Sequence, residues 1–256
     1  MLKIILSRLK PQAEKIIVEE QAGFRAGRST KEQIFNLRSL CEKYIQHHVF
    51  IDFKKAFDRV WHAALWATMK KYNISTNLIQ IIKNLYNKAT SAVLLDSSIG
   101  DWFRTTVGVR QGCLLSPTLF NIFLERVMTD ALEDHEGTVS TGGRTITNLR
   151  FADDVHGLAG EEEELANLVE RLDKASTAYG MEISAEKTKL MTNNTSGINA
   201  EIKVNGQKLE TVTSLKYLGS VITNEGSKPE NTLQDSTDNS SIDKVETTLE
   251  RQELVS

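Results

Sequence analysis

The spacing of apolar residues predicts a chain in which helices alternate with short strands. Helical spacing recurs in residues 29–45, 62–88, 116–132 and 161–179. The second of these segments predicts two helices that are interrupted near Asn73. Ser116 as N-cap and Pro117 in the first turn mark the start of the third segment, and Gly180 marks the end of the fourth. We expect these helices to form a scaffold around a sheet.

Strand-like segments lie between the helices. Apolar or β-branched runs of strand length occupy residues 49–52, 91–96, 102–107 and 148–155, the middle two forming a predicted hairpin. Asn205-Gly206 is a two-residue hairpin signal, and residues 215–223 predict a single strand. This mixture favours the α+β class. After Gly226 the chain is rich in Ser, Thr, Asn and Asp and loses its apolar periodicity, which predicts disorder.

Two adjacent carboxylates, Asp153 and Asp154, lie inside the apolar run of residues 148–155. Neighbouring side chains of a regular strand point to opposite faces, so adjacent aspartates converge on one site only where the backbone turns tightly. The sequence therefore predicts a hairpin with an acidic tip. For an isolated Asp-Asp pair the commoner interpretation is an exposed turn.

A third carboxylate, Asp52, ends another strand-like run about a hundred residues earlier. One carboxylate at a strand end and two at a hairpin tip have the ligands for two divalent cations, which in paired sites assist in-line phosphoryl displacement. Hard oxygen ligands suit Mg²⁺. The pattern therefore indicates nucleotidyl transfer or its hydrolytic relatives.

Composition restricts the class of protein and the cell compartment in which this chemistry is expected. The 256 residues carry a formal net charge of -3, which argues against a generally basic nucleic-acid coat but allows local basic patches. Cys41 and Cys113 have neither metal-ligand spacing nor a disulfide framework, which favours an intracellular, reducing compartment. No apolar run approaches the roughly 18 residues that span a bilayer, so we expect no membrane anchor and no export.

A series of sequence blocks resembles one known family, the reverse transcriptases of non-LTR (LINE-type) retrotransposons. The blocks follow the family's order: Gln21–Thr30, Phe50–Asp58, Gly108–Pro117, Phe151–Asp154, Gly180–Thr188 and Leu215–Gly219. The resemblance covers roughly residues 2–224 and is highly specific as an ordered set. It departs from the family at His156-Gly157, where apolar residues are usual and where we expect weaker packing.

The resemblance implies an α+β fold, the right-hand polymerase palm of the reverse-transcriptase type. Residues 1–48 would be partial fingers and residues 49–224 the palm, with the thumb missing. We hypothesise that residues 225–256, expected to be disordered, are a frameshifted reading of a thumb segment. Without a thumb and the triphosphate-binding fingers, we expect weak or no processive synthesis.

The resemblance also implies the activity, RNA-directed DNA polymerisation, and its residues. Catalysis would use Asp52, Asp153 and Asp154 as ligands of two Mg²⁺ ions, with Mn²⁺ as an alternative, and Lys187 as proton donor to pyrophosphate. The residues that would contact nucleotide or template are Arg25, Arg28, Phe57, Arg110, Gln111 and Gly112. Phe57 would exclude a 2′-hydroxyl on the incoming nucleotide. The primer grip falls on Tyr217, Leu218 and Gly219. The partners would be an RNA template, a DNA primer and deoxynucleoside triphosphates; the oligomeric state is not predicted.

Two alternatives stay open. The chain is a catalytically weak or inactive remnant that at most binds nucleic acid or a protein partner, or it is a metal-dependent nuclease. The nuclease ranks lower because it does not explain the Gln111 motif or the block of residues 215–219. Among other polar residues, we expect His47 and His48 at the surface and a structural role for Asp58.

Overall fold

The computed structural model describes residues 1–43, 47–87, 90–95, 98–193, 198 and 201–224. The tail of residues 225–256 lies outside them, so its disorder and its frameshift stay predictions. The helical elements are α1 (Leu2–Ala13), α2 (Thr30–Lys43), the 3-10 helix η1 (Ala56–Arg59), α3 (His62–Lys71), α4 (Thr76–Asn87), α5 (Ser116–Leu132) and α6 (Glu162–Ala178). No helix among the described residues has the length and apolarity that crossing a bilayer requires.

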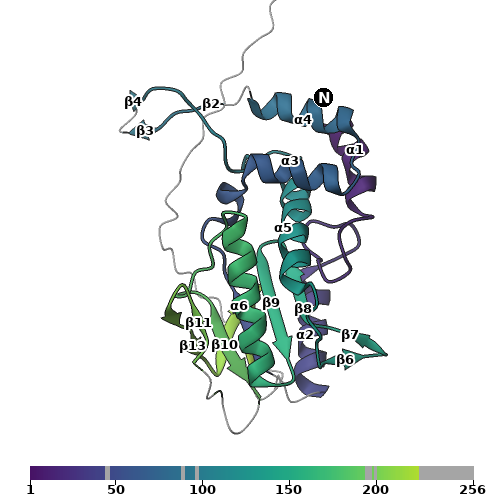
Figure 1. The fold of residues 1–256 in the computed structure, drawn as a ribbon, viewed down its shortest axis with the longest axis vertical. Coiled ribbons are helices and arrows are strands. Elements are labelled where there is room, and N and C mark those ends of the chain that lie inside the picture. Colours follow the sequence, from purple (N-terminus) through teal and green to yellow (C-terminus); the bar gives the residue numbers. More distant parts are fainter. Residues whose placement is uncertain (44–46, 88–89, 96–97, 194–197, 199–200, 225–256) are drawn as a thin grey trace, which may run out of the picture.

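A five-stranded sheet with the order β13-β10-β1-β9-β8 occupies the half of the molecule away from α1 and α4 (Figure 1). Its strands are β1 (His47–Ile51), β8 (Asn148–Phe151), β9 (Asp154–Ala159), β10 (Lys189–Thr192) and β13 (Glu210–Thr211). β1 runs antiparallel to both neighbours, with Val49 opposite Gly157 on one side and Leu190 on the other. All five residues of this central strand are buried.

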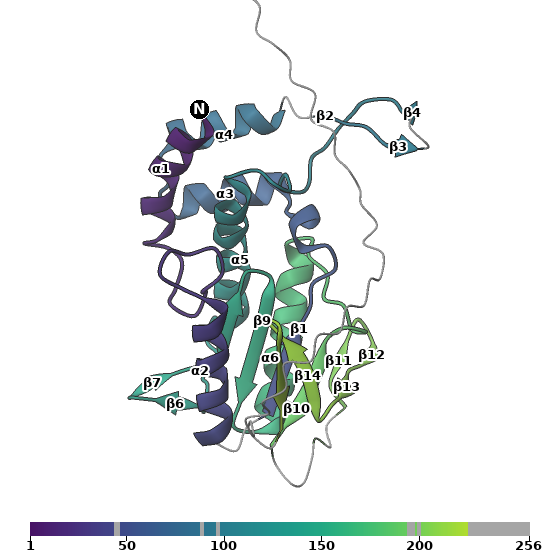
Figure 2. The same ribbon diagram turned by 180° about the vertical axis from the view of Figure 1, so that it is seen from behind.

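Different elements cover the two faces of the sheet. Helices α5 and α6 pack on one face, whereas α2 and the hairpin of β14 (Ser214–Tyr217) and β15 (Ser220–Thr223) pack on the other (Figures 1 and 2). Alternate residues of a strand point to opposite faces. Val49 and Ile51 therefore join the core beneath α5 and α6, while Phe50 packs with Leu37 and Leu40 of α2.

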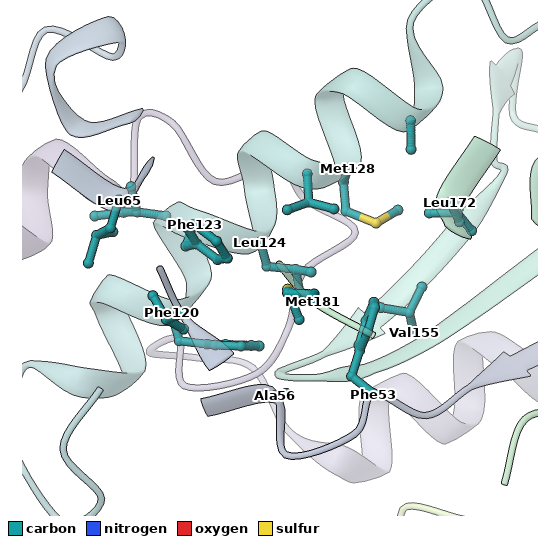
Figure 3. Packing of buried hydrophobic residues seen from close by; sticks show 14 of the residues in the cluster. Phe53, Ala56, Leu65, Phe120, Phe123, Leu124, Met128, Val155, Leu172 and Met181 are labelled. Carbon is teal, nitrogen blue, oxygen red and sulfur yellow. The ribbon is translucent and has the colours of Figure 1, made fainter. Parts of the chain in front are cut away.

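The larger core extends from the sheet to the N-terminal helix. Figure 3 shows Phe120, Phe123 and Leu124 of α5 within it. Ile5 and Leu9 of α1 belong to the same cluster. The core thus joins the segment expected as partial fingers to the expected palm, and the boundary between residues 48 and 49 stays a prediction.

The remaining strands form short hairpins. They are β2 (Thr90–Ser91) with β5 (Phe103–Arg104), β3 (Leu94–Leu95) with β4 (Ser98–Ile99), β6 (Ser140–Thr141) with β7 (Arg144–Thr145), and β11 (Lys203–Val204) with β12 (Gln207–Lys208). The hairpins predicted within residues 91–107 and at Asn205-Gly206 are thereby confirmed. The prediction of a single strand at residues 215–223 is wrong. Leu218 and Gly219, with φ of 47° and 83°, turn the chain, so that β14 and β15 form a hairpin. Consecutive positive φ values are those of a tight hairpin turn.

Gly157 has a packing role that its mid-strand position did not suggest. A Cβ at this residue would lie 2.8 Å from Val49 Cγ1 and 3.0 Å from Leu168 Cδ2. The missing side chain therefore leaves room for α6 to pack closely against β9. The cost that we expect from a mid-strand glycine and a buried histidine at this point of the strand stays a prediction.

The prediction that His47 and His48 lie at the surface is also wrong. β1 begins at His47, and both residues are buried. His48 Nδ1 lies 3.1 Å from Nε2 of the fully buried His156, and their rings stack at a centroid distance of 5.2 Å. Each imidazole gives the other a hydrogen-bond partner inside the core, which offsets part of the cost of burial.

We predict that acid destabilises the protein through this pair. Burial lowers the pKa of His48 from 6.5 to about 4. Below pH 6.5 the unfolded chain binds a proton that the folded chain excludes, so stability present above pH 6.5 is lost as the pH falls toward 4. At about 1.4 kcal/mol per pKa unit, His48 alone should cost on the order of 2 kcal/mol between pH 7 and pH 5. Urea unfolding at the two pH values measures the loss.

The matched control is the double variant His48→Leu/His156→Leu, which removes both imidazoles. Its free energy of unfolding should depend less on pH over the same interval. An unchanged pH dependence would show that other groups cause the acid sensitivity.

Candidate active site

Asp153 and Asp154 lie at a tight turn between β8 and β9, as the apolar run predicted. Phe151 pairs with Asp154, so only Ala152 and Asp153 make the connection. Ala152 is buried and has a φ of 60°, in the left-handed region. This conformation is unfavourable for a residue with a Cβ, and the surrounding contacts must hold it.

Asp52 directly follows β1 and lies next to this turn. The register of β1 and β9 pairs Ile51 with Val155, so the next position along the ladder brings Asp52 opposite Asp154. The Asp52 N–H donates to Thr188 Oγ1 at 3.3 Å, and its carbonyl accepts from the Ser184 N–H at 2.8 Å. Strand pairing and these two bonds therefore fix the Asp52 backbone beside the hairpin.

The three carboxylates share one electrostatic environment. Burial, followed by the charge of Asp52, raises the pKa of Asp153. Burial, followed by the charges of Asp153 and Asp52, raises the pKa of Asp154 to about 6. The negative charges are thus close enough to oppose one another's ionisation.

Lys187 is the cation of this cluster. Its Nζ lies 3.7 Å from Asp52 Oδ1, and its side chain is 69% exposed. An ion pair this exposed contributes little to stability. Asp52 Oδ1 itself is buried and has no hydrogen-bond partner among the described residues.

The carboxylates fit a divalent cation by their chemistry. All three supply hard oxygen donors, and Asp52 Oδ1 has an unused acceptor position. Within the described ranges, no three His, Cys, Asp or Glu side chains form a ready-made metal cluster. Mg²⁺ commonly binds through one or two carboxylates and is completed by water and substrate phosphates, so a preformed cage is not required.

The loop before α5 lies against η1, where the Val109 N–H donates to the Phe57 carbonyl at 2.8 Å. Gln111 Nε2 donates to Asp58 Oδ1 at 3.3 Å, which agrees with a structural role for Asp58. Arg110 donates to the Leu85 carbonyl at 3.1 Å. Gly112 has a φ of 77° and open space where a Cβ would point. Contacts of Arg110, Gln111 and Gly112 with nucleotide or template stay predictions.

One detail of this loop differs from the prediction. α5 begins at Ser116, but Leu115 is its N-cap. The Ser116 hydroxyl instead donates to the Arg110 carbonyl at 2.6 Å and so holds the loop rather than capping the helix.

Phe57 of η1 lies between two other aromatic rings. It stacks on Phe120 at a centroid distance of 4.3 Å, and the ring of Phe24 meets it edge-on at 6.1 Å. Phe24 is 51% exposed. Packing thus fixes the orientation of Phe57, while its exclusion of a 2′-hydroxyl stays a prediction.

The two arginines expected at template or phosphate are occupied within the protein. Arg25 pairs with Glu14 at 2.9 Å and donates to the Val18 carbonyl, and its side chain is only 12% exposed. Arg28 pairs with Glu19 at 3.1 Å and also with Glu32. In this conformation both arginines hold their own loop together, and their contact with nucleic acid stays a prediction.

Tyr217, expected in the primer grip, packs close to Asp154 and its turn. Its ring meets that of Phe50 edge-on at a centroid distance of 5.4 Å. Burial, followed by the charge of Asp154, raises the pKa of the Tyr217 phenol. The adjoining Leu218 and Gly219 form the hairpin turn, and the role of all three in holding a primer stays a prediction.

Sequence reasoning missed Gln21, which contacts the turn of Ala152 and Asp153 from the side of the N-terminal loop. The side chain of Gln21 hydrogen-bonds both the N–H and the carbonyl of Ala152. Gln21 is the first residue of the block Gln21–Thr30. In that block nucleic-acid contacts were assigned to the arginines, because positive charge is the commoner sign of such contacts. The only local signal was a polar residue directly before Ala22 and Gly23.

Comparison with the sequences of known proteins identifies the family of this chain. Residues 1–222 match the model of the family "Reverse transcriptase (RNA-dependent DNA polymerase)". The polymerase of the mobile element jockey from Drosophila melanogaster is 29% identical over 233 residues, 86% of this chain and 25% of the relative. The Pol polyprotein of a type-1 R2 retrotransposable element from Nasonia vitripennis is 31% identical over 187 residues, 69% of this chain and 18% of the relative. The chain thus spans a quarter or less of these relatives.

Solved structures agree on the fold. Apo telomerase from Candida tropicalis superposes with a TM-score of 0.63 and 15% identity, over 88% of this chain and 40% of that one. This likeness supports the expected polymerase palm. The turn that carries Asp153 and Asp154 beside Asp52 thus lies in a chain that belongs to the reverse transcriptase family, with relatives among non-LTR retrotransposon polymerases.

Proposed function

We propose that this chain carries out RNA-directed DNA synthesis. It extends the 3′-hydroxyl of a DNA primer along an RNA template with deoxynucleoside triphosphates. The observation that carries the proposal is the meeting of Asp52 with Asp153 and Asp154 at the end of β1. Family membership supports a nucleic-acid template as partner, while primer and deoxynucleotides follow from the proposed reaction.

In the proposed reaction the primer 3′-oxygen attacks the α-phosphorus and its proton passes to solvent. The bond from that phosphorus to the oxygen bridging to the β-phosphate breaks, and pyrophosphate leaves. The family generally uses divalent metal ions, and we assign Asp52, Asp153 and Asp154 as the residues that would hold two Mg²⁺ or Mn²⁺ ions. Such ions stabilise negative charge on the attacking and leaving oxygens when bound.

The remaining assigned side chains act on the substrates. Lys187, solvent-exposed beside Asp52, donates a proton to the leaving pyrophosphate. Phe57, fixed between Phe120 and Phe24, faces the sugar of the incoming nucleotide. Tyr217, Leu218 and Gly219 hold the primer end close to the carboxylates.

The proposal is tested by extension of a labelled DNA primer on an RNA template, with Mg²⁺ and deoxynucleotides. The purified chain is compared with Asp153→Asn, which keeps the shape of the side chain and removes its charge. We expect extension by the wild type and a loss of about a thousandfold in the variant, the upper end of the range for removing one group that stabilises charge in the transition state. An unextended primer with folded wild-type protein would favour the remnant, and a shortened primer would favour the nuclease.

Phe57 provides a separate prediction about substrate choice. Phe57→Val removes the ring that would meet a 2′-hydroxyl, so we expect ribonucleotide incorporation to rise by about 10- to 100-fold relative to deoxynucleotide incorporation, the effect of one pocket contact. Competition between ribo- and deoxynucleotides in primer extension measures the ratio. Phe24→Leu is the control, because Phe24 only borders Phe57, and an equal rise in both variants would contradict the assignment.

A further inference from the structure

The catalytic turn is held in an unfavourable backbone conformation. Ala152 has a φ of 60° and is buried. A left-handed conformation is unfavourable for a residue with a Cβ, and such a residue persists only where its surroundings fix it. What fixes Ala152 therefore also fixes the direction in which the following aspartates project.

The side chain of Gln21 supplies that constraint. Its Oε1 accepts from the Ala152 N–H at 2.9 Å, and its Nε2 donates to the Ala152 carbonyl at 3.1 Å. The same Oε1 also accepts from the Gly23 N–H at 2.8 Å. Gln21 is 1% exposed, so water does not compete for these bonds. A carboxamide suits this task because it has a donor and an acceptor; a glutamate would lose the bond to the Ala152 carbonyl.

Gly23 permits the close approach on which these bonds depend. A Cβ at Gly23 would lie 2.0 Å from the Ala152 nitrogen and 2.8 Å from its Cα. No side chain fits this gap without moving one of the two backbones. The Gly23 carbonyl also accepts from Asn121 Nδ2 of α5 at 2.8 Å.

Backbone pairing anchors the loop along the edge of β8. The Arg150 N–H donates to the Glu20 carbonyl at 2.8 Å, and the Ala22 N–H donates to the Arg150 carbonyl at 2.8 Å. Gln21 thereby forms a parallel bridge with Arg150. The segment before Gly23 is thus an added strand-like edge that ends directly behind the catalytic turn.

We propose that Gln21, seated by Gly23, is a positioning residue that holds Ala152 in its left-handed conformation and so orients Asp153 and Asp154. The catalytic consequence rests on the proposed function; the constraint on the turn does not. Gln21 touches no reacting atom, and its effect reaches the carboxylates through the Ala152 peptide. Loss of Gln21 should therefore lower kcat and metal affinity more than it raises KM for the primer-template.

The test uses Gln21→Met, which keeps the length of the side chain and removes its hydrogen bonds. The matched control is Gln33→Met, because Gln33 is also buried and donates at 3.3 Å to the carbonyl of Arg150, which precedes Ala152 by two residues. Thermal unfolding establishes that both variants fold. Gln21→Glu is the second variant at the site, should the methionine variant fail to fold.

Two readouts separate positioning from packing. Hydrogen exchange at the Ala152 amide should accelerate at least tenfold in Gln21→Met and not in Gln33→Met. Mn²⁺ binding, followed by electron paramagnetic resonance, should weaken by about tenfold in Gln21→Met alone, the usual effect of removing a supporting hydrogen bond behind a metal ligand. Equal exchange rates in the two variants would overturn the proposal.

The readouts also separate this proposal from the proposed function. If the wild type extends no primer, the proposed function fails, while faster exchange in Gln21→Met alone still supports the role of Gln21. If the wild type extends primer but Gln21→Met and Gln33→Met have the same kcat and KM, Gln21 is structural only.

Discussion

Asp52→Asn should abolish primer extension while leaving the fold intact. Asparagine has the shape of aspartate, and the contacts that hold Asp52 involve its backbone N–H and carbonyl. The substitution removes the negative charge from the end of β1, beside Asp153 and Asp154. We expect extension to fall by at least about a thousandfold, or roughly 4 kcal/mol of activation free energy. Single-turnover primer extension, with circular dichroism as the check on folding, measures the effect.

The matched control for Asp52→Asn is Asp134→Asn. Asp134 follows α5 at the end opposite the Gln111 loop, is exposed, and has a φ of 55° that asparagine also tolerates. Its substitution should leave extension within about twofold of the wild type, as for a surface change away from any site. Retention of extension in Asp52→Asn would remove Asp52 from the catalytic group.

Arg150→Met should destabilise the fold more than most substitutions. Arg150 of β8 and Glu125 of α5 are 1% and 4% exposed and form an ion pair at 3.3 Å. Glu125 also accepts from the Val18 N–H at 3.3 Å. Removing the arginine leaves a buried carboxylate without its cation, which typically costs 3–5 kcal/mol. Urea unfolding should show a loss of about this size.

The double variant Arg150→Met/Glu125→Gln provides the control. With both charges removed, the free energy of unfolding should recover part of the loss, because no unpaired charge stays buried. A double variant as unstable as the sum of the two single variants would show that the two side chains do not interact. Glu125→Gln alone also provides a measurement if Arg150→Met does not fold.

Local pattern was sufficient to predict the long helices and the acidic turn. Helical spacing predicted α5 and α6 to within a residue or two of their bounds, because a buried face repeats at short range. The hairpin carrying Asp153 and Asp154 followed from an apolar run interrupted by two charges. The family resemblance then related Asp52 to this hairpin across about a hundred residues, and the pairing of β1 with β9 brings them together.

Local sequence patterns did not predict which polar side chains from distant segments contact each other. His48 and His156 are 108 residues apart, and neither residue signals its partner. Gln21 and Ala152 are 131 residues apart and meet only when the loop joins the edge of β8. Arg25 was expected to contact template or phosphate, but it pairs with Glu14 and donates to the Val18 carbonyl. In each case the role of the polar side chain depends on contacts that form only in the folded chain.

The central claim is that the cluster of Asp52, Asp153 and Asp154 performs templated DNA synthesis. The most direct measurement is to sequence the products that the purified chain makes from one primer on two RNA templates that differ at a single position. We predict products complementary to each template and differing at that position, with none from Asp153→Asn. Products that ignore the template, or extension that persists in Asp153→Asn, would contradict the claim.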